Sequence, residues 1–114
     1  MNQSCIFCKI HEGEIPSDIL YRDEGCFVIR DIVPKAPVHL LILPTRHFTY
    51  LSGMTPEDEE MIGHLFIVAR EMAKKEGLTE RGYRLIINQG PDSGQVVPHL
   101  HLHLLGGHAL GAMG

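Results

Sequence analysis

The stretch Pro98–Gly107, PHLHLHLLGG, constrains the fold of this chain more than any other part of its sequence. Histidine and leucine alternate along it. Successive side chains of a β-strand point to opposite faces of its sheet, so the pattern predicts a strand with an imidazole face and an apolar face. The histidines are His99, His101 and His103, and the leucines are Leu100, Leu102 and Leu104. The leucines suit a core, whereas the histidines need a chemical explanation because other residue types make better strand surfaces.

Four explanations of the three imidazoles are open at this point. They form a solvated polar face, or they are the remnant of a purification tag, although tags are contiguous and terminal. Three neutral imidazoles can also hold a zinc ion that keeps an open coordination position. Alternatively, one imidazole is a nucleophile, and its neighbours orient it and bind an anion.

The preceding loop, NQGPDSGQVVPH, favours the nucleophile. Gly90 and Gly94 allow backbone conformations that turn N–H groups toward one point, and such groups bind phosphate. Asn88 and Gln95 add side-chain donors, and an ordinary turn is the alternative. A phosphate site beside three histidines fits phosphoryl or nucleotidyl transfer better than hydration of a carbonyl or of carbon dioxide.

Length and charge limit the possible functions. The 114 residues suffice for one domain with its own core, and we expect a single domain over residues 1–114. A formal net charge of −4 argues against nucleic acid or an anionic membrane as the main partner. The sequence contains no apolar run that could span a bilayer and no signal pattern at its start, so we expect a cytoplasmic protein.

Hydrophobic periodicity predicts two helices and five strands. A long helix starts with Thr55 as N-cap and Pro56 at its first position, and it ends before Gly77. A short helix is predicted at residues 6–11. The strands are predicted at residues 19–22, 26–31, 38–43, 83–88 and 99–105. Together they predict an α+β fold with a five-stranded, mainly antiparallel sheet, one long helix and one short helix.

Cys5 and Cys8 form a Cys-x-x-Cys pair at the start of the chain. With three cysteines in all, the chain does not have the composition of a secreted disulfide framework. Redox pairs follow a strand and open a helix, but no strand precedes this pair, so we favour half of a structural zinc site. The alternative is that both thiols are simply buried as small apolar groups.

The sequence resembles the histidine triad (HIT) family, and the resemblance covers essentially the whole chain. HLHLHLL matches the family signature His-x-His-x-His-x-x, in which x is hydrophobic. The segment CIFCKIHEGEIPSDILYRDEGCFVIRDIVPKAPVHLLILPTRH, followed by GHLFIVAR and GYRLIINQG, matches in order and spacing. The resemblance implies a HIT-like fold, a homodimer, and hydrolysis of purine nucleoside phosphoramidates by the branch of histidine triad nucleotide-binding proteins.

The resemblance also assigns catalytic roles. His101 would attack the α-phosphorus and carry the nucleotidyl group as a covalent intermediate, without a metal or other cofactor for this step. His39 would support His101, and His103 would lie near the phosphate and the leaving group. Asn88 and the backbone of Gly94 and Val96 would hold phosphate oxygens. Asp31 would bind the ribose hydroxyls, and the base pocket would be lined by Phe7, Ile10, Ile29 and Ile32.

By the same resemblance, the zinc held by Cys5 and Cys8 would take His47 and His99 as its other two ligands. One position departs from the family pattern. Val96 stands where phosphoramidases of this branch commonly have serine or threonine, so a hydroxyl donor is absent. This departure gives weight to a second hypothesis, a slow or inactive nucleotide-binding regulatory protein of the same fold. A third hypothesis is a zinc hydrolase with the metal on the three histidines of the triad.

Overall fold

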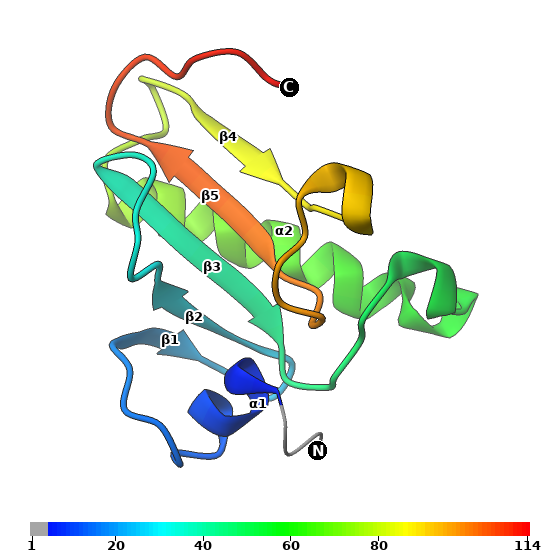
Figure 1. Ribbon diagram of the computed structural model, residues 1–114. Coiled ribbons are helices and arrows are strands. Elements are labelled where there is room, and N and C mark those ends of the chain that lie inside the picture. Colours follow the sequence, from blue (N-terminus) through cyan, green and yellow to red (C-terminus); the bar gives the residue numbers. More distant parts are fainter. Residues whose placement is uncertain (1–4) are drawn as a thin grey trace.

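The computed structural model describes residues 5–114, which form a five-stranded sheet with helices on both faces (Figure 1). The strand order is β1-β2-β3-β5-β4, and every neighbouring pair is antiparallel. The strands are β1 (Ile19–Arg22), β2 (Cys26–Arg30), β3 (Val38–Pro44), β4 (Tyr83–Ile86) and β5 (Leu102–Gly106). The predicted α+β fold with an antiparallel five-stranded sheet is therefore confirmed.

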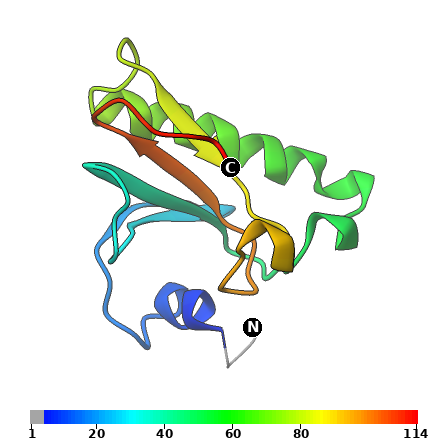
Figure 2. The ribbon, with the colours of Figure 1, turned by 45° about the horizontal axis from the view of Figure 1, so that its top comes forward.

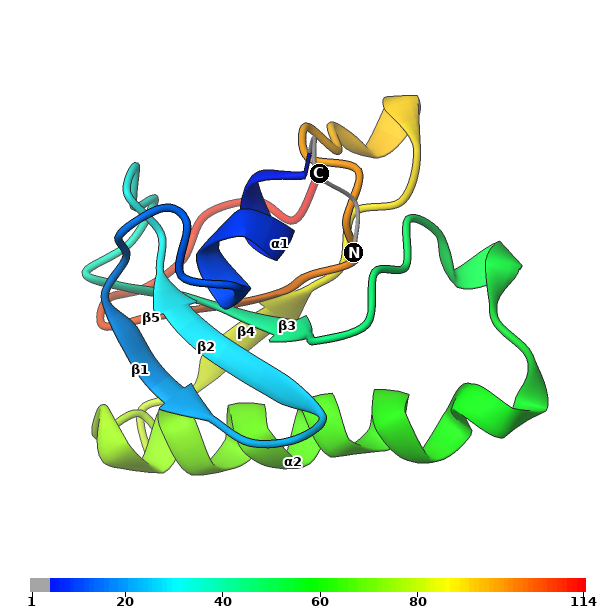
Figure 3. The same ribbon diagram turned by 90° about the horizontal axis from the view of Figure 1, so that it is seen from below.

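The long helix α2 (Glu59–Lys75) covers one face of the sheet (Figure 3). A turn of 3₁₀ helix at Pro56–Asp58 leads into it, and the Thr55 N–H donates to the Asp58 carboxylate at 2.9 Å. The buried side of α2 packs on the alternating leucines of the triad segment. This core contains Leu65, Val68, Met72, Leu100, Leu102 and Leu104. No helix within residues 5–114 combines the length and the apolar character needed to cross a bilayer.

The short helix α1 (Ile6–His11) lies on the opposite face of the sheet (Figures 2 and 3). Its apolar side packs on β2 and β3 and forms a second, smaller core, in which Phe7, Ile10, Phe27, Ile29 and Leu41 are buried. The triad histidines lie on this face, because the two-residue alternation that buries the leucines under α2 turns the imidazoles toward α1. The functional site therefore lies between the sheet and α1.

The strand predicted at residues 99–105 begins only at Leu102, which corrects one boundary of the prediction. The backbone before it bonds elsewhere. The N–H of Leu100 donates to the carbonyl of Phe48, and the carbonyl of His99 accepts a bond from the His101 ring. Because these backbone groups already have partners, they cannot form hydrogen bonds with a neighbouring strand, and residues 99–101 are not part of the sheet.

His64 and Asp23 tie α2 to the turn between β1 and β2. His64 Nε2 lies 2.6 Å from Asp23 Oδ2, and the other carboxylate oxygen accepts the N–H groups of Gly25 and Cys26. Burial alone would raise the pKa of Asp23, but the hydrogen bonds from His64, Tyr21 and these two amides lower it well below its usual range. No role for His64 could be predicted from the sequence, because its partner Asp23 is far away in the chain.

Gly107 follows β5 in a conformation that only glycine adopts easily. Its φ is +102°, and a Cβ placed there would meet Pro37 Cβ at 2.8 Å. We predict that Gly107→Ala lowers the free energy of unfolding by about 1–3 kcal/mol. Gly111→Ala is the matched control, because nothing lies within 4 Å of its Cβ position. Urea unfolding of both variants measures the difference, and equal stabilities would contradict this account.

Candidate active site

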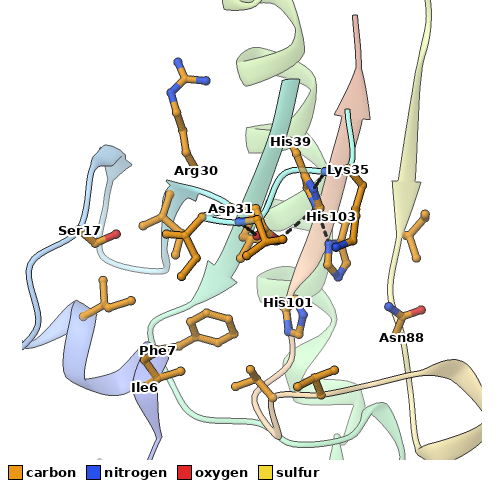
Figure 4. A pocket seen from close by; sticks show the side chains of 18 of the residues that line it. Ile6, Phe7, Ser17, Arg30, Asp31, Lys35, His39, Asn88, His101 and His103 are labelled. Carbon is orange, nitrogen blue, oxygen red and sulfur yellow. Dashed lines mark hydrogen bonds and ion pairs between the residues drawn. The ribbon is translucent and has the colours of Figure 1, made fainter. Parts of the chain in front are cut away.

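A cavity of about 720 Å³ opens between α1, the sheet and the loop that precedes β5 (Figure 4). Apart from Gln95, its lining brings together every residue that the sequence assigned to catalysis or nucleotide binding. These residues are Phe7, Ile10, Ile29, Asp31, Ile32, His39, Asn88, Gly94, Val96, His101 and His103. They come from six separate parts of the chain, from α1 to β5. The fold thus gathers them at one place, and their individual geometry decides what they can do.

The ring of His101 is held by the backbone just before it. Its Nδ1 lies 2.7 Å from the carbonyl oxygen of His99. A carbonyl oxygen can only accept a hydrogen bond, so Nδ1 must carry the proton. In the neutral ring, Nε2 then keeps its lone pair, and His101 contributes to the cavity wall. The backbone therefore selects the tautomer in which Nε2 can act as a nucleophile.

His39 and His103 are hydrogen-bonded to each other, and a different backbone group fixes the orientation of their rings. The N–H of Lys35 donates to His39 Nδ1 at 3.0 Å, so this nitrogen accepts and His39 Nε2 carries the proton in the neutral ring. His39 Nε2 lies 2.9 Å from His103 Nδ1 and 3.4 Å from Asp31 Oδ2. A donor at His39 Nε2 makes His103 Nδ1 an acceptor, so the proton of His103 is on Nε2. That Nε2 is buried and has no hydrogen-bond partner among residues 5–114.

Both rings of this pair are neutral near neutral pH. Burial lowers the pKa of His103 to about 4, with repulsion from His101 and His39 acting in the same direction. Burial also lowers the pKa of His39, although the nearby carboxylate of Asp31 opposes this shift. The hydrogen-bond chain from Lys35 through His39 therefore presents a neutral His103 with an N–H that is available to a ligand.

One geometric expectation needs correction. We expected His39 to support His101 directly, but His39 bonds to His103, and the group that holds the His101 ring is the His99 carbonyl. His101 and His103 are still neighbours, with ring centroids 4.8 Å apart. The sequence could not distinguish the two partners, because a backbone carbonyl leaves no signal in residue type.

Asp31 lies where β2 ends, between the apolar side of the cavity and the histidines (Figure 4). One of its carboxylate oxygens accepts the N–H of Val33 at 2.9 Å, and the other faces His39. On the α1 side, Phe7, Ile10 and Ile29 are buried in the cavity wall. Ile32 also lines the cavity, but it stands on the rim and is 89% exposed.

The loop between β4 and β5 contributes Asn88, Gly94 and Val96 to the cavity. Gly94 has a φ of +84°, which explains the glycine there. Gln95, expected to face a ligand, instead ties the loop together. Its side chain accepts the N–H of Gly90 at 2.8 Å and donates to the carbonyls of Thr49 and Val97. Val96 is 89% exposed on the rim.

The four residues expected to bind zinc form one cluster beside the active-site cavity. Cys5, Cys8, His47 and His99 each offer a ligand atom, and these atoms all lie within 4.8 Å of one another. The Nδ1 atoms of both histidines face the sulfur atoms at 3.3 Å. His99 Nε2 donates to the carbonyl of Pro44, which leaves Nδ1 as the ligand nitrogen. Two thiols and two imidazoles suit a closed tetrahedral site, so the cluster could hold a metal ion.

The same cluster argues against a metal on all three triad histidines. His99 turns its Nδ1 toward Cys5 and Cys8, whereas His101 and His103 line the cavity. His99 is also completely buried. The three rings therefore do not converge on one point within the described part of the chain, and the hypothesis of a zinc hydrolase centred on the triad loses its geometric basis.

Residues 12–110 match the family model of the HIT domain. The chain belongs to the HIT family. It is 45% identical over 113 residues to the purine nucleoside phosphoramidase of Escherichia coli, covering 99% of this chain and 95% of that protein. It also matches the structure of a HIT family hydrolase from Clostridium thermocellum, with a TM-score of 0.94 and 42% identity over 98% of this chain and 97% of the other.

A histidine triad protein from Clostridium difficile has a TM-score of 0.95 and 38% identity, covering 100% of this chain and 99% of that one. These matches confirm the recognition of the HIT family and its fold. They also make the protein a HIT-type hydrolase.

Several cavity residues of this HIT hydrolase were not identified from the sequence, and three of them lie next to the histidines. Leu41 on β3 and Ile86 on β4 are both paired with His103 across the sheet, so the three side chains form a row on one face. Two-residue alternation along β3 and β4 could have identified both. The third is Lys35, in the turn between β2 and β3. No sequence signal separates it from any other surface lysine.

Proposed function

We propose that this protein hydrolyses purine nucleoside phosphoramidates at the α-phosphate through a covalent nucleotidyl intermediate on His101. The observation that carries the proposal is the 2.7 Å contact between the His99 carbonyl and Nδ1 of His101, which lines the cavity. It leaves Nε2 of a neutral ring as the nucleophile. The 45% identity to a protein named purine nucleoside phosphoramidase supports the choice of substrate.

The substrate would lie across the cavity, with its base at α1. The apolar walls formed by Phe7, Ile10 and Ile29, with Ile32 at the rim, suit a purine ring. Asp31, next to these walls, would accept hydrogen bonds from the ribose hydroxyls. Asn88 and the backbone N–H groups at Gly94 and Val96 would then bind the phosphate oxygens near His101.

In the first step, the lone pair of His101 Nε2 attacks the α-phosphorus, and the bond from phosphorus to the leaving amine breaks. The bonding electrons remain on the amine nitrogen, which takes a proton from a solvent water and leaves a hydroxide ion. His103 stays neutral, and its unpartnered Nε2–H would donate a hydrogen bond to a phosphate oxygen as charge builds up there. The His101 ring gains positive charge as the new bond forms, and the His99 carbonyl stabilises that charge through Nδ1–H.

In the second step, the hydroxide oxygen attacks the phosphorus and the bond to His101 Nε2 breaks. The electron pair returns to Nε2, so His101 is again a neutral ring. The products are a nucleoside monophosphate and a free amine, and both histidines are in their starting protonation states. No step requires a metal.

We predict that His101→Ala lowers turnover of an adenosine phosphoramidate by at least about a thousandfold, because the covalent route is lost. Binding of AMP should change little, since the base, ribose and phosphate contacts proposed above remain. His108→Ala is the matched control, because His108 is exposed and does not line the cavity. Steady-state kinetics and calorimetry measure the two effects. Substantial activity in His101→Ala would reject the assignment.

The alternative function is a slow nucleotide-binding regulatory protein, and Val96 is the observation that favours it. A valine side chain offers no donor to the phosphate or to the leaving group. We predict that Val96→Ser raises kcat for an adenosine phosphoramidate roughly tenfold. Val33→Ser, at another exposed position of the rim, is the matched control. An unchanged rate in a folded Val96→Ser protein would show that this enzyme obtains the donor elsewhere.

We further propose that Cys5, Cys8, His47 and His99 bind a structural zinc ion. When bound, the ion would join α1 to the segment before β5, and so hold the cavity walls on either side of His101. We predict about one zinc per chain, lost in Cys8→Ser and retained in Cys26→Ala, because Cys26 lies outside the cluster. Metal analysis of the purified proteins measures this. Zinc retained in Cys8→Ser would contradict the site.

We also propose a homodimer, as the resemblance implies. β4 is an edge strand of the sheet, and Phe66, Ile67 and Tyr83 are exposed apolar residues of α2 and β4. We predict sedimentation at micromolar concentration with twice the chain mass. Phe66→Glu should weaken the dimer, whereas Met113→Glu, at another exposed position, should not. A monomer of the unmodified protein at these concentrations would reject the proposal.

A further inference from the structure

Lys35 brings an unpaired positive charge to the active-site cavity. Arg30 and Lys35 are the basic residues that line it within residues 5–114. Arg30 pairs with Glu76 at 3.1 Å and with Asp18 at 3.8 Å, and its side chain extends away from the histidines (Figure 4). No described acidic side chain forms an ion pair with Lys35.

The backbone contacts of Lys35 place it at the histidine end of the cavity. Its N–H donates to His39 Nδ1 at 3.0 Å, and His39 in turn bonds to His103. Figure 4 shows its side chain on the side of His39 and His103, with Phe7 and α1 on the other side of His101. If the base lies at α1 and the phosphate at His101, the Lys35 side of the cavity receives the leaving group.

The surrounding groups do not neutralise this charge. His39 and His103 are neutral near neutral pH because burial lowers the pKa of each. Among residues 5–114, Asp31 is the acidic residue that lines the cavity, but its oxygens face the Val33 N–H and His39. A ligand group that approaches from the leaving-group side therefore meets one ammonium group on a flexible stem.

On the basis of the proposed function, we infer that the preferred leaving group is an amine that carries a negative charge, bound by the ammonium group of Lys35. The simplest member of this class is an α-amino acid joined to the nucleotide through its amine, with its carboxylate free. Leaving groups that keep a free ammonium group, such as lysinamide joined through its α-amine, would be repelled by Lys35. Lys35 would thus determine specificity and take no part in bond making.

The test compares substrates that share the scissile bond and differ in charge. Adenosine phosphoramidates of alanine and of alaninamide have nearly the same shape, and only the first carries a carboxylate. We expect kcat/KM to be roughly three- to tenfold higher for the alanine substrate at low salt, and the ratio to shrink as salt screens the charges. A third substrate, with a phosphonate in place of the carboxylate, tests whether another anion binds equally well at this site. Its kcat/KM should also exceed that of the alaninamide substrate.

Side-chain variants of Lys35 separate its charge from its backbone role, since all of them keep the N–H that holds His39. Lys35→Met should bring the ratio of the two kcat/KM values to about one, and Lys35→Arg should preserve the preference. Lys35→Glu should reverse it in favour of alaninamide. Lys9→Met, which removes the same charge outside the cavity lining, is the matched control and should leave the ratio unchanged.

The outcomes separate this inference from the proposed function. If the unmodified protein hydrolyses neither phosphoramidate, the proposed function fails. If it hydrolyses both equally well at low salt, the proposed function stands and the inference is overturned. A preference for the alanine substrate that persists in Lys35→Met shows that another group binds the carboxylate, which also overturns the assignment to Lys35.

Discussion

The alternation of histidine and leucine before and within β5 is the constraint on which the rest of the structure depends. The leucines bury their side chains under α2 and fix the segment in the core. The histidines then have to lie on the opposite face, where Phe7 of α1 packs against the rings of His99 and His101. Burial of apolar surface, the dominant favourable term in folding, therefore also positions the catalytic side chains. A shift of one residue would place the imidazoles in the core and the leucines in the cavity.

Backbone groups, more than side chains, give each histidine its separate chemistry. The Pro44 carbonyl turns the Nδ1 of His99 toward the cysteines, and the His99 carbonyl selects the Nδ1–H form of His101. The Lys35 N–H sets the opposite protonation of His39 and, through it, that of His103. Three identical side chains, spaced two apart, thus become a metal ligand, a nucleophile and a hydrogen-bond donor to the phosphate in the proposed function.

Much of this was accessible from the sequence, because the informative signals are local in the chain. Strand alternation, helix periodicity and the resemblance predicted the elements and gathered the cavity residues. The failures involve contacts that residue types do not encode. The start of β5 at Leu102 depends on a ring that takes up a backbone carbonyl, and Gln95 turned out to brace its own loop. Lys35 was missed because no sequence signal distinguishes a lysine that lines a cavity from any other surface lysine.

The central claim is that backbone contacts fix the tautomers of the catalytic histidines, and nitrogen NMR of the imidazole rings tests it directly. In protein labelled with ¹⁵N at histidine, near neutral pH, the account predicts that His101 is protonated at Nδ1 and unprotonated at Nε2. His39 and His103 should show the reverse. A His101 ring protonated at Nε2, with its lone pair on Nδ1, would contradict the account, because the nitrogen that faces the substrate could not then attack phosphorus.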